Sequence, residues 1–444
     1  MKRILAVVLV LILAALCFAA CDGEGGSSLV PGSSNITSNI PSETPSDTSS
    51  EVPSTPSHLP TPPPSSSDVS GEVSSKEDED TTPTFTPIAD EDRYYYKNLT
   101  DLQKEIYLIL KDYIENFKTG YITLETENGK IESIDEIIVA NLALRNDHPE
   151  YFWIPNRYGY MIDGFGTYSF AYLGNGDNEE EAYLCSKEEA ELMIKSQDDI
   201  VNGFISTLKP DMTDYDIELA LHDWLAGYVN YSDEAAASHE TYPLAYTAYG
   251  ALVNGSAVCE GYAEAFTLIL NRLGIESITI TGTLDGVGHK WNMVNIGGDW
   301  YHVDVTNDDN QIVEHGIDYI HRFFNLSDSH LFARGYAIDP DFSADVMENE
   351  SFNLTRPSAT ATLKSYYNVS GYVVKANLPS ENFISLIEEA KKNGKKIFEF
   401  HIDEDLTEFD YVSFIQEANT ALLERDIQVY WMGWGDNDKF IIFK

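Results

Sequence analysis

Basic residues, cysteines and long apolar runs are scarce in this 444-residue chain. It has 28 Lys and Arg against 73 Asp and Glu, and the resulting net charge of −45 excludes nucleic acid as a partner, because phosphate binding needs a basic surface. Four cysteines in this length exclude a disulfide-stabilised scaffold. The long apolar run over residues 4–20 holds about 17 residues, at the lower limit for crossing a bilayer.

Residues 1–20 predict an export signal. Two basic residues precede the apolar run, and Ala19-Ala20 lies directly before Cys21, which resembles the bacterial lipobox. The resemblance implies cleavage before Cys21 and lipid attachment to its sulfur, and Cys17 fits less well because Leu16 before it is bulky. An ordinary cleaved signal peptide and an uncleaved anchor are the alternatives. We expect an extracytoplasmic lipoprotein that is anchored to the bacterial cell membrane.

Residues 21–92 predict the lipidated cysteine and a disordered tether. Of 18 prolines, 11 lie between Pro31 and Pro87, and residues 22–92 carry 14 acids against one base. Such a composition buries too little apolar surface to offset its ordering entropy, and like charges keep it extended. Residues 93–444 keep a net charge of −34, which fits a soluble extracytoplasmic domain that anionic lipid repels.

The folded part shows helix-start signals followed by strand signals. Hydroxyl residues at 100, 133, 186 and 213 can each cap a helix, and residues 151–174 are rich in aromatics and glycine and predict strands. Residues 93–212 are expected to form a helical and strand extension, and residues 213–355 the core. Residues 356–444 alternate strands and helices and predict a small C-terminal α+β module.

Three chemistry-bearing residues follow one another in the core. Cys259 begins an apolar helix that ends before Gly274, and unpaired N–H groups at such a start favour thiolate and can hold an oxyanion. His289 starts a strand predicted over residues 289–296, and Asp304 lies in one predicted over residues 300–306. A Cys, a His and a carboxylate in this order can form a nucleophile, its base and the group that orients the base.

Each of these residues has a plainer interpretation. Cys259 could be a small core residue, His289 a polar rim residue and Asp304 the cap of a turn. Zinc binding by Cys259, His302 and Asp304 is disfavoured, because no second Cys or His lies at the expected spacing. We expect no metal and no cofactor. Cys185 lies on no motif and is expected to be a buried free thiol, although a disulfide with Cys259 would inactivate the nucleophile.

Residues 213–310 resemble the bacterial transglutaminase-like superfamily. The motifs that carry the resemblance are Leu221-His222-Asp223-Trp224-Leu225, Asn230-Tyr231-Ser232, residues 248–255, Val258-Cys259-Glu260-Gly261-Tyr262, His289-Lys290-Trp291-Asn292 and Trp300-x-x-x-Asp304-x-Thr306. The resemblance implies an α+β, papain-like core in which the helix bearing the cysteine packs on an antiparallel sheet bearing the histidine and the aspartate. It also implies a triad of Cys259, His289 and Asp304 that reacts through a thioester acyl-enzyme.

Aromatic residues close to the triad are expected to wall the site. Tyr262, Trp291 and Trp300 are the candidates for substrate binding or for exclusion of water. Glu260 follows the cysteine where animal crosslinking enzymes have tryptophan, which favours hydrolysis over crosslinking.

The strand register presents a difficulty for the triad. If Gly298-Asp299 is a two-residue turn, Asp304 pairs with Met293 and lies four residues along the sheet from His289. That separation is about 13 Å, too long for a hydrogen bond, so a wider loop or a bulge is needed.

The function expected from these residues is that of a cell-surface, thiol-dependent amide hydrolase or acyltransferase. Its substrate would be a peptide, a protein or a cell-wall peptide, and the protein is expected to be a monomer with no nucleic-acid partner. The alternative is a non-catalytic binding or scaffold protein that retains the fold.

Overall fold

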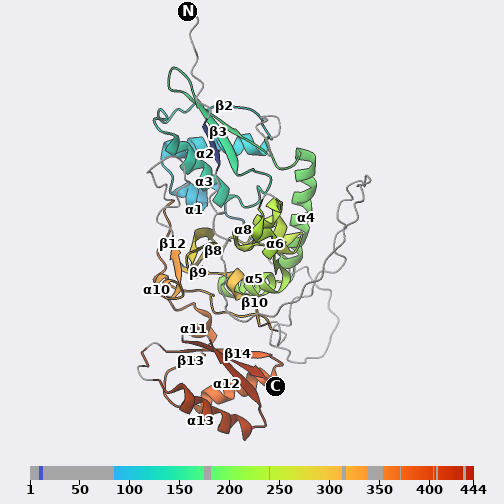
Figure 1. The fold of residues 1–444 in the computed structure, drawn as a ribbon, viewed down its shortest axis with the longest axis vertical. Helices are drawn as coiled ribbons and strands as arrows, with labels where there is room; N and C mark the ends of the chain where they lie inside the picture. Colours follow the sequence, from blue (N-terminus) through green and yellow to red (C-terminus); the bar gives the residue numbers. More distant parts are fainter. Residues whose placement is uncertain are drawn as a thin grey trace, which may run out of the picture.

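The computed structural model describes residues 10–13, 85–174, 182–239, 241–312, 317–338, 354–370, 372–403, 405–406, 409–433 and 437–444. The predicted cleavage site, Cys21 and most of the predicted tether lie outside these residues. The described chain forms three parts stacked along the long axis, in the order of the sequence (Figure 1). Within the described ranges, no helix combines the length and the apolar character needed to cross a bilayer.

The N-terminal part packs helices against a small antiparallel sheet of order β1-β3-β4-β2. Its elements are β1 (Val10–Leu13), η1 (Asp90–Asp92), α1 (Tyr94–Lys97), α2 (Asp101–Glu115), β2 (Ile122–Thr123), α3 (Ile134–Asp147), β3 (Arg157–Ile162), β4 (Tyr168–Tyr172) and α4 (Lys187–Ile205). The predicted caps are present at Thr100, Ser133 and Ser186, each of which accepts a backbone N–H from its own helix. The β1 strand falls inside the predicted export signal, so its removal would leave β3 at the edge of this sheet.

The middle part places one long helix on a four-stranded antiparallel sheet of order β12-β7-β8-β9. The main elements are α5 (Asp214–Tyr228), α8 (Cys259–Arg272), β7 (Ser277–Leu284), β8 (Val287–Ile296), β9 (Asp299–Val303), α9 (Val305–Asp308) and β12 (Tyr336–Ile338). Asn292 of β8 joins the sheet to α8 by donating to the carbonyl of Ala263 at 2.8 Å and to Thr267 at 2.9 Å. The expected mixed α+β class, with the cysteine helix on the antiparallel sheet, is confirmed.

Short elements complete the middle part and lead around the start of α8. These are β5 (Asn230–Tyr231), α6 (Asp233–Ala237), η2 (Pro243–Tyr246), α7 (Ala248–Leu252), β6 (Ser256–Ala257), β10 (Asp309–Ile312), β11 (Ile317–Tyr319) and α10 (Asp328–Phe332). The parallel pairing of β5 with β6 brings the chain after α5 next to the residues that precede Cys259.

The hairpin register is not the one that would separate His289 from Asp304. Ile296 pairs with Asp299, so the turn is Gly297-Gly298, whose φ angles of +66° and +95° suit glycine. The predicted strand over residues 300–306 was wrong at its end, because β9 stops at Val303 and Asp304 caps α9. This register, continued by one residue, sets Asp304 opposite Trp291 and two residues from His289, so neither a wider loop nor a bulge is needed.

The C-terminal part is the expected small α+β module. Its elements are α11 (Tyr366–Ser370), β13 (Val373–Val374), α12 (Glu381–Lys392), β14 (Ile397–Ile402), α13 (Tyr411–Leu423), β15 (Val429–Gly433) and β16 (Asp438–Phe443), with sheet order β13-β14-β16-β15. It has its own buried cluster, centred on residues such as Ile387, Phe400 and Phe414. Phe440 and Ile442 also pack on Ile317 and Ile320, which attaches the module to the middle part.

The predicted tether ends earlier than expected, because residues 85–92 pack on the folded part. Phe85 lies against the core around α8, and the Ile88 N–H donates to the carbonyl of Asn271 at 2.9 Å. Asp90 forms ion pairs with Arg93 at 3.4 Å and Lys111 at 3.3 Å. The boundary predicted at residue 92 was therefore too late, because residues 85–92 already pack on the folded part.

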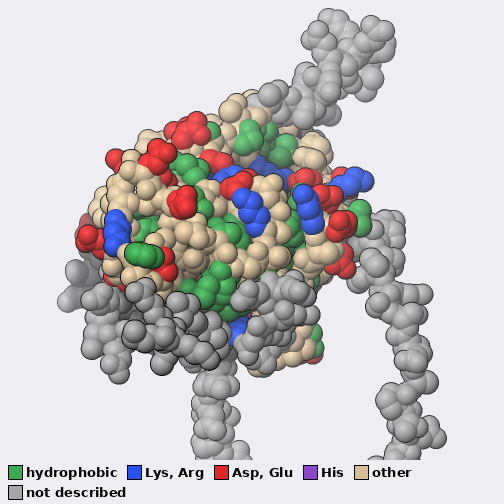
Figure 2. All heavy atoms as spheres, turned by 90° about the horizontal axis from the view of Figure 1, so that it is seen from above, with side chains coloured by type: hydrophobic (Ala, Val, Ile, Leu, Met, Phe, Trp, Pro, Cys, Tyr) green, Lys and Arg blue, Asp and Glu red, His purple; other side chains and the backbone are tan. Residues whose placement is uncertain are grey.

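The outer face of the N-terminal part shows acidic and basic side chains intermixed with apolar ones (Figure 2). Basic groups on this face stand beside acids, so the excess of acid over base does not leave the face with one sign only. This arrangement is typical of a solvated surface.

Candidate active site

Cys259 is the first residue of α8 and is partly exposed. The N-cap residue, Val258, supplies no side-chain acceptor, so it leaves the first N–H groups of the helix uncapped. Those groups and the positive end of the helix dipole lie beside the thiol. These groups can bind an oxyanion that forms in the site.

Gly261 lets the start of α8 approach the preceding loop closely. A Cβ built on Gly261 would lie 2.7 Å from the carbonyl oxygen of Ala245 and 3.0 Å from that of Thr247. The Val258 N–H donates to the same Ala245 carbonyl at 3.0 Å. The glycine two residues after the cysteine is therefore needed for packing that holds the thiol in place.

His289 and Asp304 are brought together by the β8–β9 hairpin. His289 Nε2 donates to Asp304 Oδ2 at 2.6 Å, with the His289 side chain 11% exposed and the Asp304 side chain 1% exposed. This contact leaves Nδ1 of the ring for the thiol, and Cys259 lies close enough to act on the histidine by hydrogen bonding and charge. The structure thus assembles the three residues that the sequence singled out.

Asp304 uses both carboxylate oxygens. Oδ1 accepts the backbone N–H of Asn307 at 3.1 Å, which caps α9. Oδ2 accepts a hydrogen bond from the His289 ring, a second from the Asn307 amide at 2.7 Å and a third from the Tyr336 hydroxyl at 2.5 Å. Sequence reasoning missed Asn307 and Tyr336. The cap position of Asp304 could have indicated Asn307 three residues later, but Tyr336 lies on β12 and leaves no local signal.

His289 and Asp304 each stabilise the charged form of the other. Burial alone would lower the pKa of His289, but the Asp304 carboxylate and the Cys259 sulfur raise it to about 10. Burial alone would raise the pKa of Asp304, but His289, Tyr336 and Asn307 hold it below its usual value. At neutral pH the arrangement therefore favours an imidazolium beside the thiol, as a cysteine nucleophile requires.

An ion pair joins α8 to β8 beside the triad. It is formed by the residues that directly follow Cys259 and His289. Lys290 Nζ donates to Glu260 at 2.8 Å and lies 3.7 Å from Glu264, one turn further along α8. Burial raises the pKa of Glu264 to about 7, although Lys290 opposes this rise. This ion pair joins the first turn of α8 to the start of β8, and so it fixes the spacing of the thiol and the imidazole.

Trp291 lies next to His289, as expected, but it is buried. The two rings are 6.0 Å apart and inclined by 19°, and the indole N–H donates to His302 Nδ1 at 3.0 Å. His302 in turn contacts Asp328 through Nε2 at 2.9 Å. His302 therefore supports the tryptophan from behind, and both of its nitrogens are engaged away from the thiol.

The other two aromatic candidates do not wall the site. Tyr262 is fully buried, and its hydroxyl donates to Asp309 at 2.5 Å. Trp300 pairs with Asn295 near the far end of the hairpin, about 20 Å along β8 from His289. Its ring contacts Tyr94 at 5.2 Å in the N-terminal part. The predicted roles of Tyr262 and Trp300 were wrong.

The two described cysteines are chemically distinct. Both are free, so the structure holds no disulfide between Cys185 and Cys259. Cys185 is only partly buried, and desolvation together with Glu189 raises its pKa to about 11. Its thiol is thus held in the inert, protonated form that suits a non-catalytic residue.

The family comparison agrees with the expected core. Residues 204–305 match the model of the Transglutaminase-like superfamily, and this range includes Cys259, His289 and Asp304. No curated protein matches the chain. Solved structures that resemble it include one titled as a crystal structure of a TGase, with 16% identity and a TM-score of 0.26 over 44% of this chain and 43% of that one.

A second solved structure is described as a candidate cysteine protease from Cytophaga hutchinsonii. It shares 14% identity with a TM-score of 0.21, over 43% of this chain and 63% of that one. This chain thus spans less than two thirds of either structure. Likeness at this level defines no substrate and no activity.

Proposed function

We propose that this protein is a thiol-dependent enzyme that transfers acyl groups from amides, with Cys259 as nucleophile, His289 as acid and base, and Asp304 as the residue that orients His289. One observation carries the proposal: the buried 2.6 Å hydrogen bond from His289 to Asp304, set beside a thiol at an uncapped helix start. The match of residues 204–305 to the Transglutaminase-like superfamily supports it.

The proposed reaction has two steps. The Cys259 thiolate attacks the amide carbonyl carbon, and the first N–H groups of α8 stabilise the oxyanion. His289 gives its Nδ1 proton to the departing amine, which leaves a thioester on Cys259. His289 then takes a proton from water, and the resulting hydroxide releases the acyl group as a carboxylic acid. An amine in place of water would give a new amide.

We favour water as the acceptor and an extracytoplasmic peptide, protein or cell-wall peptide as the substrate. Glu260, which follows the nucleophile, is held by Lys290, so an acid stands where crosslinking relatives have an aromatic residue. The proposed surface location rests on the sequence of residues 1–21.

The test of the chemistry is capture of the thioester. Purified protein is mixed with peptides and peptidoglycan fragments, quenched in acid and analysed by mass spectrometry. An acyl adduct on Cys259 is expected in the wild type and in Cys185→Ala, but not in Cys259→Ala. Iodoacetamide should also label Cys259 much faster than Cys185. Equal, slow labelling together with no adduct would support the scaffold interpretation.

The test of location is the Cys21→Ser variant in cells of the source organism. We expect the variant to leave the membrane fraction for the medium or the periplasm, because its single lipid anchor is lost. Retention in the membrane with an uncleaved N-terminus would show that the apolar run itself is the anchor.

A further inference from the structure

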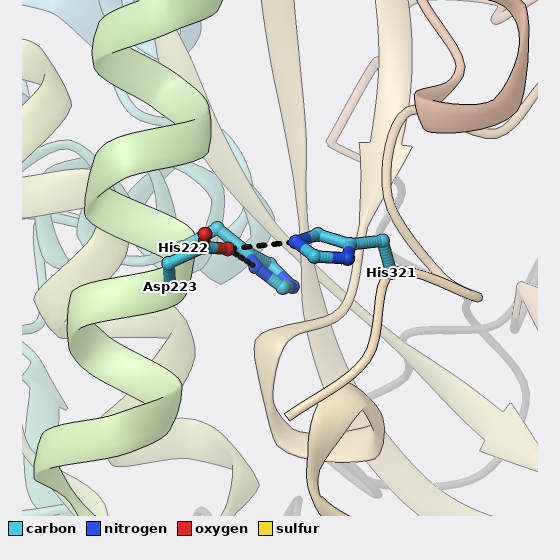
Figure 3. Close-up of side chains that lie close together, drawn as sticks. All are labelled: His222, Asp223 and His321. Carbon is cyan, nitrogen blue, oxygen red and sulfur yellow. Dashed lines mark hydrogen bonds and ion pairs between the residues drawn. The ribbon is translucent and has the colours of Figure 1, made fainter. Parts of the chain in front are cut away.

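A second cluster of ionisable side chains lies away from the triad, between α5 and the segment that follows β11. His222 and Asp223 project from α5 and His321 approaches from the other side, so the Asp223 carboxylate lies between two imidazole rings (Figure 3). Asp223 Oδ1 is 3.0 Å from His222 Nδ1 and 2.8 Å from His321 Nε2. These three ligand-type atoms all lie within 4.8 Å of one another.

Each histidine has a second carboxylate on its outer nitrogen. His222 Nε2 is 3.1 Å from Asp308 Oδ2, and His321 Nδ1 is 2.7 Å from Glu399 Oε1. Asp308 and Glu399 are themselves fixed by the backbone N–H groups of Phe323 and His321. An imidazole with one nitrogen facing the cluster and the other held by a fixed carboxylate is the usual arrangement around a protein-bound metal ion.

The contacts of the cluster leave room for a cation on its inner side. Four ring nitrogens each face a carboxylate oxygen, whereas two neutral imidazoles supply only two N–H groups. When the outer nitrogens donate to Asp308 and Glu399, both inner nitrogens turn a lone pair towards Asp223, and a cation can bind these lone pairs together with the carboxylate.

The donor set and spacing suit a zinc-like ion. Two imidazoles and one carboxylate are ligands that zinc accepts, and tetrahedral bonds of about 2.0–2.1 Å separate the ligand atoms by about 3.3 Å. The two nitrogen–oxygen separations of 2.8 and 3.0 Å need to widen slightly, and the two nitrogens lie within 4.8 Å of each other. Both imidazoles are almost fully buried, whereas the Asp223 side chain is 25% exposed.

We propose that His222, Asp223 and His321 bind one divalent transition-metal ion of the zinc type, with Asp308 and Glu399 orienting the two histidines. The ion would join α5 to the segment after β11 and, through Glu399 of β14, to the C-terminal module. Nothing in the sequence indicated a metal, because none of its short motifs has the spacing of metal ligands. Asp223 and His321 are 98 positions apart, a separation that no short motif reports.

The first test measures metal binding by the whole folded chain. The triad also presents a thiol and an imidazole, so Cys259→Ala protein is used beside the wild type. After chelation and buffer exchange, calorimetric titration of Cys259→Ala protein with zinc is expected to show one site. No stoichiometric binding would overturn the proposal.

Cobalt(II) provides a test that needs no variant of the cluster. Wild-type protein with one equivalent of cobalt is expected to show ligand-field bands of a nitrogen and oxygen site without a thiolate charge-transfer band. A thiolate band that disappears in Cys259→Ala would place the ion at the triad and contradict the proposal.

The second test changes the ligands within the Cys259→Ala background. His321→Gln and Asp223→Asn are each expected to weaken zinc binding by at least about 100-fold, since each removes a direct ligand. The matched control is His401→Gln. His401 lies on β14, the same strand as Glu399, and it also pairs with a carboxylate, that of Asp438, at 2.8 Å. Unchanged zinc affinity in His321→Gln, or an equal loss in His401→Gln, would contradict the site.

Discussion

Asp304 links helix capping to catalysis through its two carboxylate oxygens. Oδ1 starts α9 and Oδ2 holds His289, so the position of the base is coupled to the fold of the chain that follows β9. From the sequence, Asp304 could be read either as a cap or as a member of the triad. In the structure it caps α9 and also contacts His289. A buried carboxylate with several donors stays ionised, which is the state needed to hold an imidazolium.

The Asp304→Asn variant is expected to separate orientation from binding. It keeps the size of the side chain but removes the charge that raises the pKa of His289 to about 10. Turnover should fall by about 100-fold or more with little change in KM, because the ion pair is needed only for chemistry. Iodoacetamide labelling of Cys259 should slow at neutral pH, and the alkaline limit of the Cys259–His289 ion pair should move to lower pH.

The control for this variant is Asp328→Asn. Asp328 contacts His302 at 2.9 Å in a similar aspartate–histidine pair that does not reach the thiol. It should keep most of the turnover and the labelling rate of Cys259. If Asp304→Asn also retains both at the wild-type level, Asp304 is structural only and the triad assignment fails.

Glu218 is a buried acid that the structure keeps protonated. Burial raises its pKa to about 8, although the Asn325 amide, which donates to Oε2 at 2.9 Å, opposes the rise. Glu218 Oε1 and Asn325 Oδ1 are both buried, and no partner within the described residues is found for either. A protonated Glu218 suits this site, since a neutral carboxyl leaves no uncompensated charge in the core.

The sign of the resulting pH dependence is testable with Glu218→Gln. Below about pH 4.5 the acid is neutral in both the folded and unfolded states, so its titration contributes nothing. As the pH rises towards 8, the unfolded state ionises first and wild-type stability falls. The Gln variant lacks this loss, so its advantage in free energy of unfolding should grow by about 2–4 kcal/mol between pH 4.5 and 8.

Thermal melts of Glu218→Gln and wild type across this pH range provide the measurement. Glu417→Gln is the control, because Glu417 is an exposed acid on α13. A difference between Glu218→Gln and wild type that stays constant with pH would show that Glu218 is ionised throughout.

At the scale of elements, the contact between α8 and β8 determines whether the thiol meets its base. Each element carries one member of the triad at its start, and the next residue in each, Glu260 or Lys290, reaches across to the other. The Lys290 and Glu260 side chains are only 10% and 18% exposed, so solvent screens this ion pair less than one at the surface. The two elements are thus joined beside the site by charge and further along by Asn292.

A double-mutant cycle of Lys290→Met and Glu260→Gln tests this positioning role. Each single variant should lower turnover by about 10-fold with KM nearly unchanged, because a displaced imidazole reacts less often. The double variant should lose little more than either single one, since both remove the same contact. Lys97→Met with Glu276→Gln, which removes an exposed pair with a 2.8 Å contact, is the control and should leave turnover unaltered. Full additivity in the first cycle would mean that the ion pair does not position the triad.

Elements defined by local chemistry could be predicted from the sequence, and contacts between distant elements could not. Thr100, Ser186 and Thr213 each start a helix with a capping box, because the cap and its partner are three residues apart. The hairpin between β8 and β9 was expected, but its register could not be decided from the sequence, because three consecutive residues, Gly297-Gly298-Asp299, fit the turn. Tyr336 could not be found, since its role depends on how β12 pairs with β7.

At the scale of the whole molecule, the chain before Arg93 connects the N-terminal part with the core. Phe85 packs beside residues of the core around α8, and Ile88 bonds to the carbonyl of Asn271 near the end of that helix. Asp90 then pairs with Arg93 and with Lys111 of α2 in the N-terminal part. Residues 85–92 therefore contribute to folding, whereas a composition-based boundary assigns them to the tether.

Truncations on either side of this segment test its contribution to stability. A chain that begins at Phe85 is expected to melt at the temperature of the mature chain, because it keeps every contact of residues 85–92. A chain that begins at Arg93 loses the partly buried Phe85 side chain, the Ile88 hydrogen bond and the Asp90 ion pairs. Their loss should cost roughly 2–3 kcal/mol, with the apolar side chain contributing most and the partly exposed ion pairs least. Calorimetry should show a melting temperature several degrees lower for this chain.

The control is a chain that begins at residue 70, which should match the one beginning at Phe85. Identical melting of all three would show that residues 85–92 add no stability and that the boundary at residue 92 is correct.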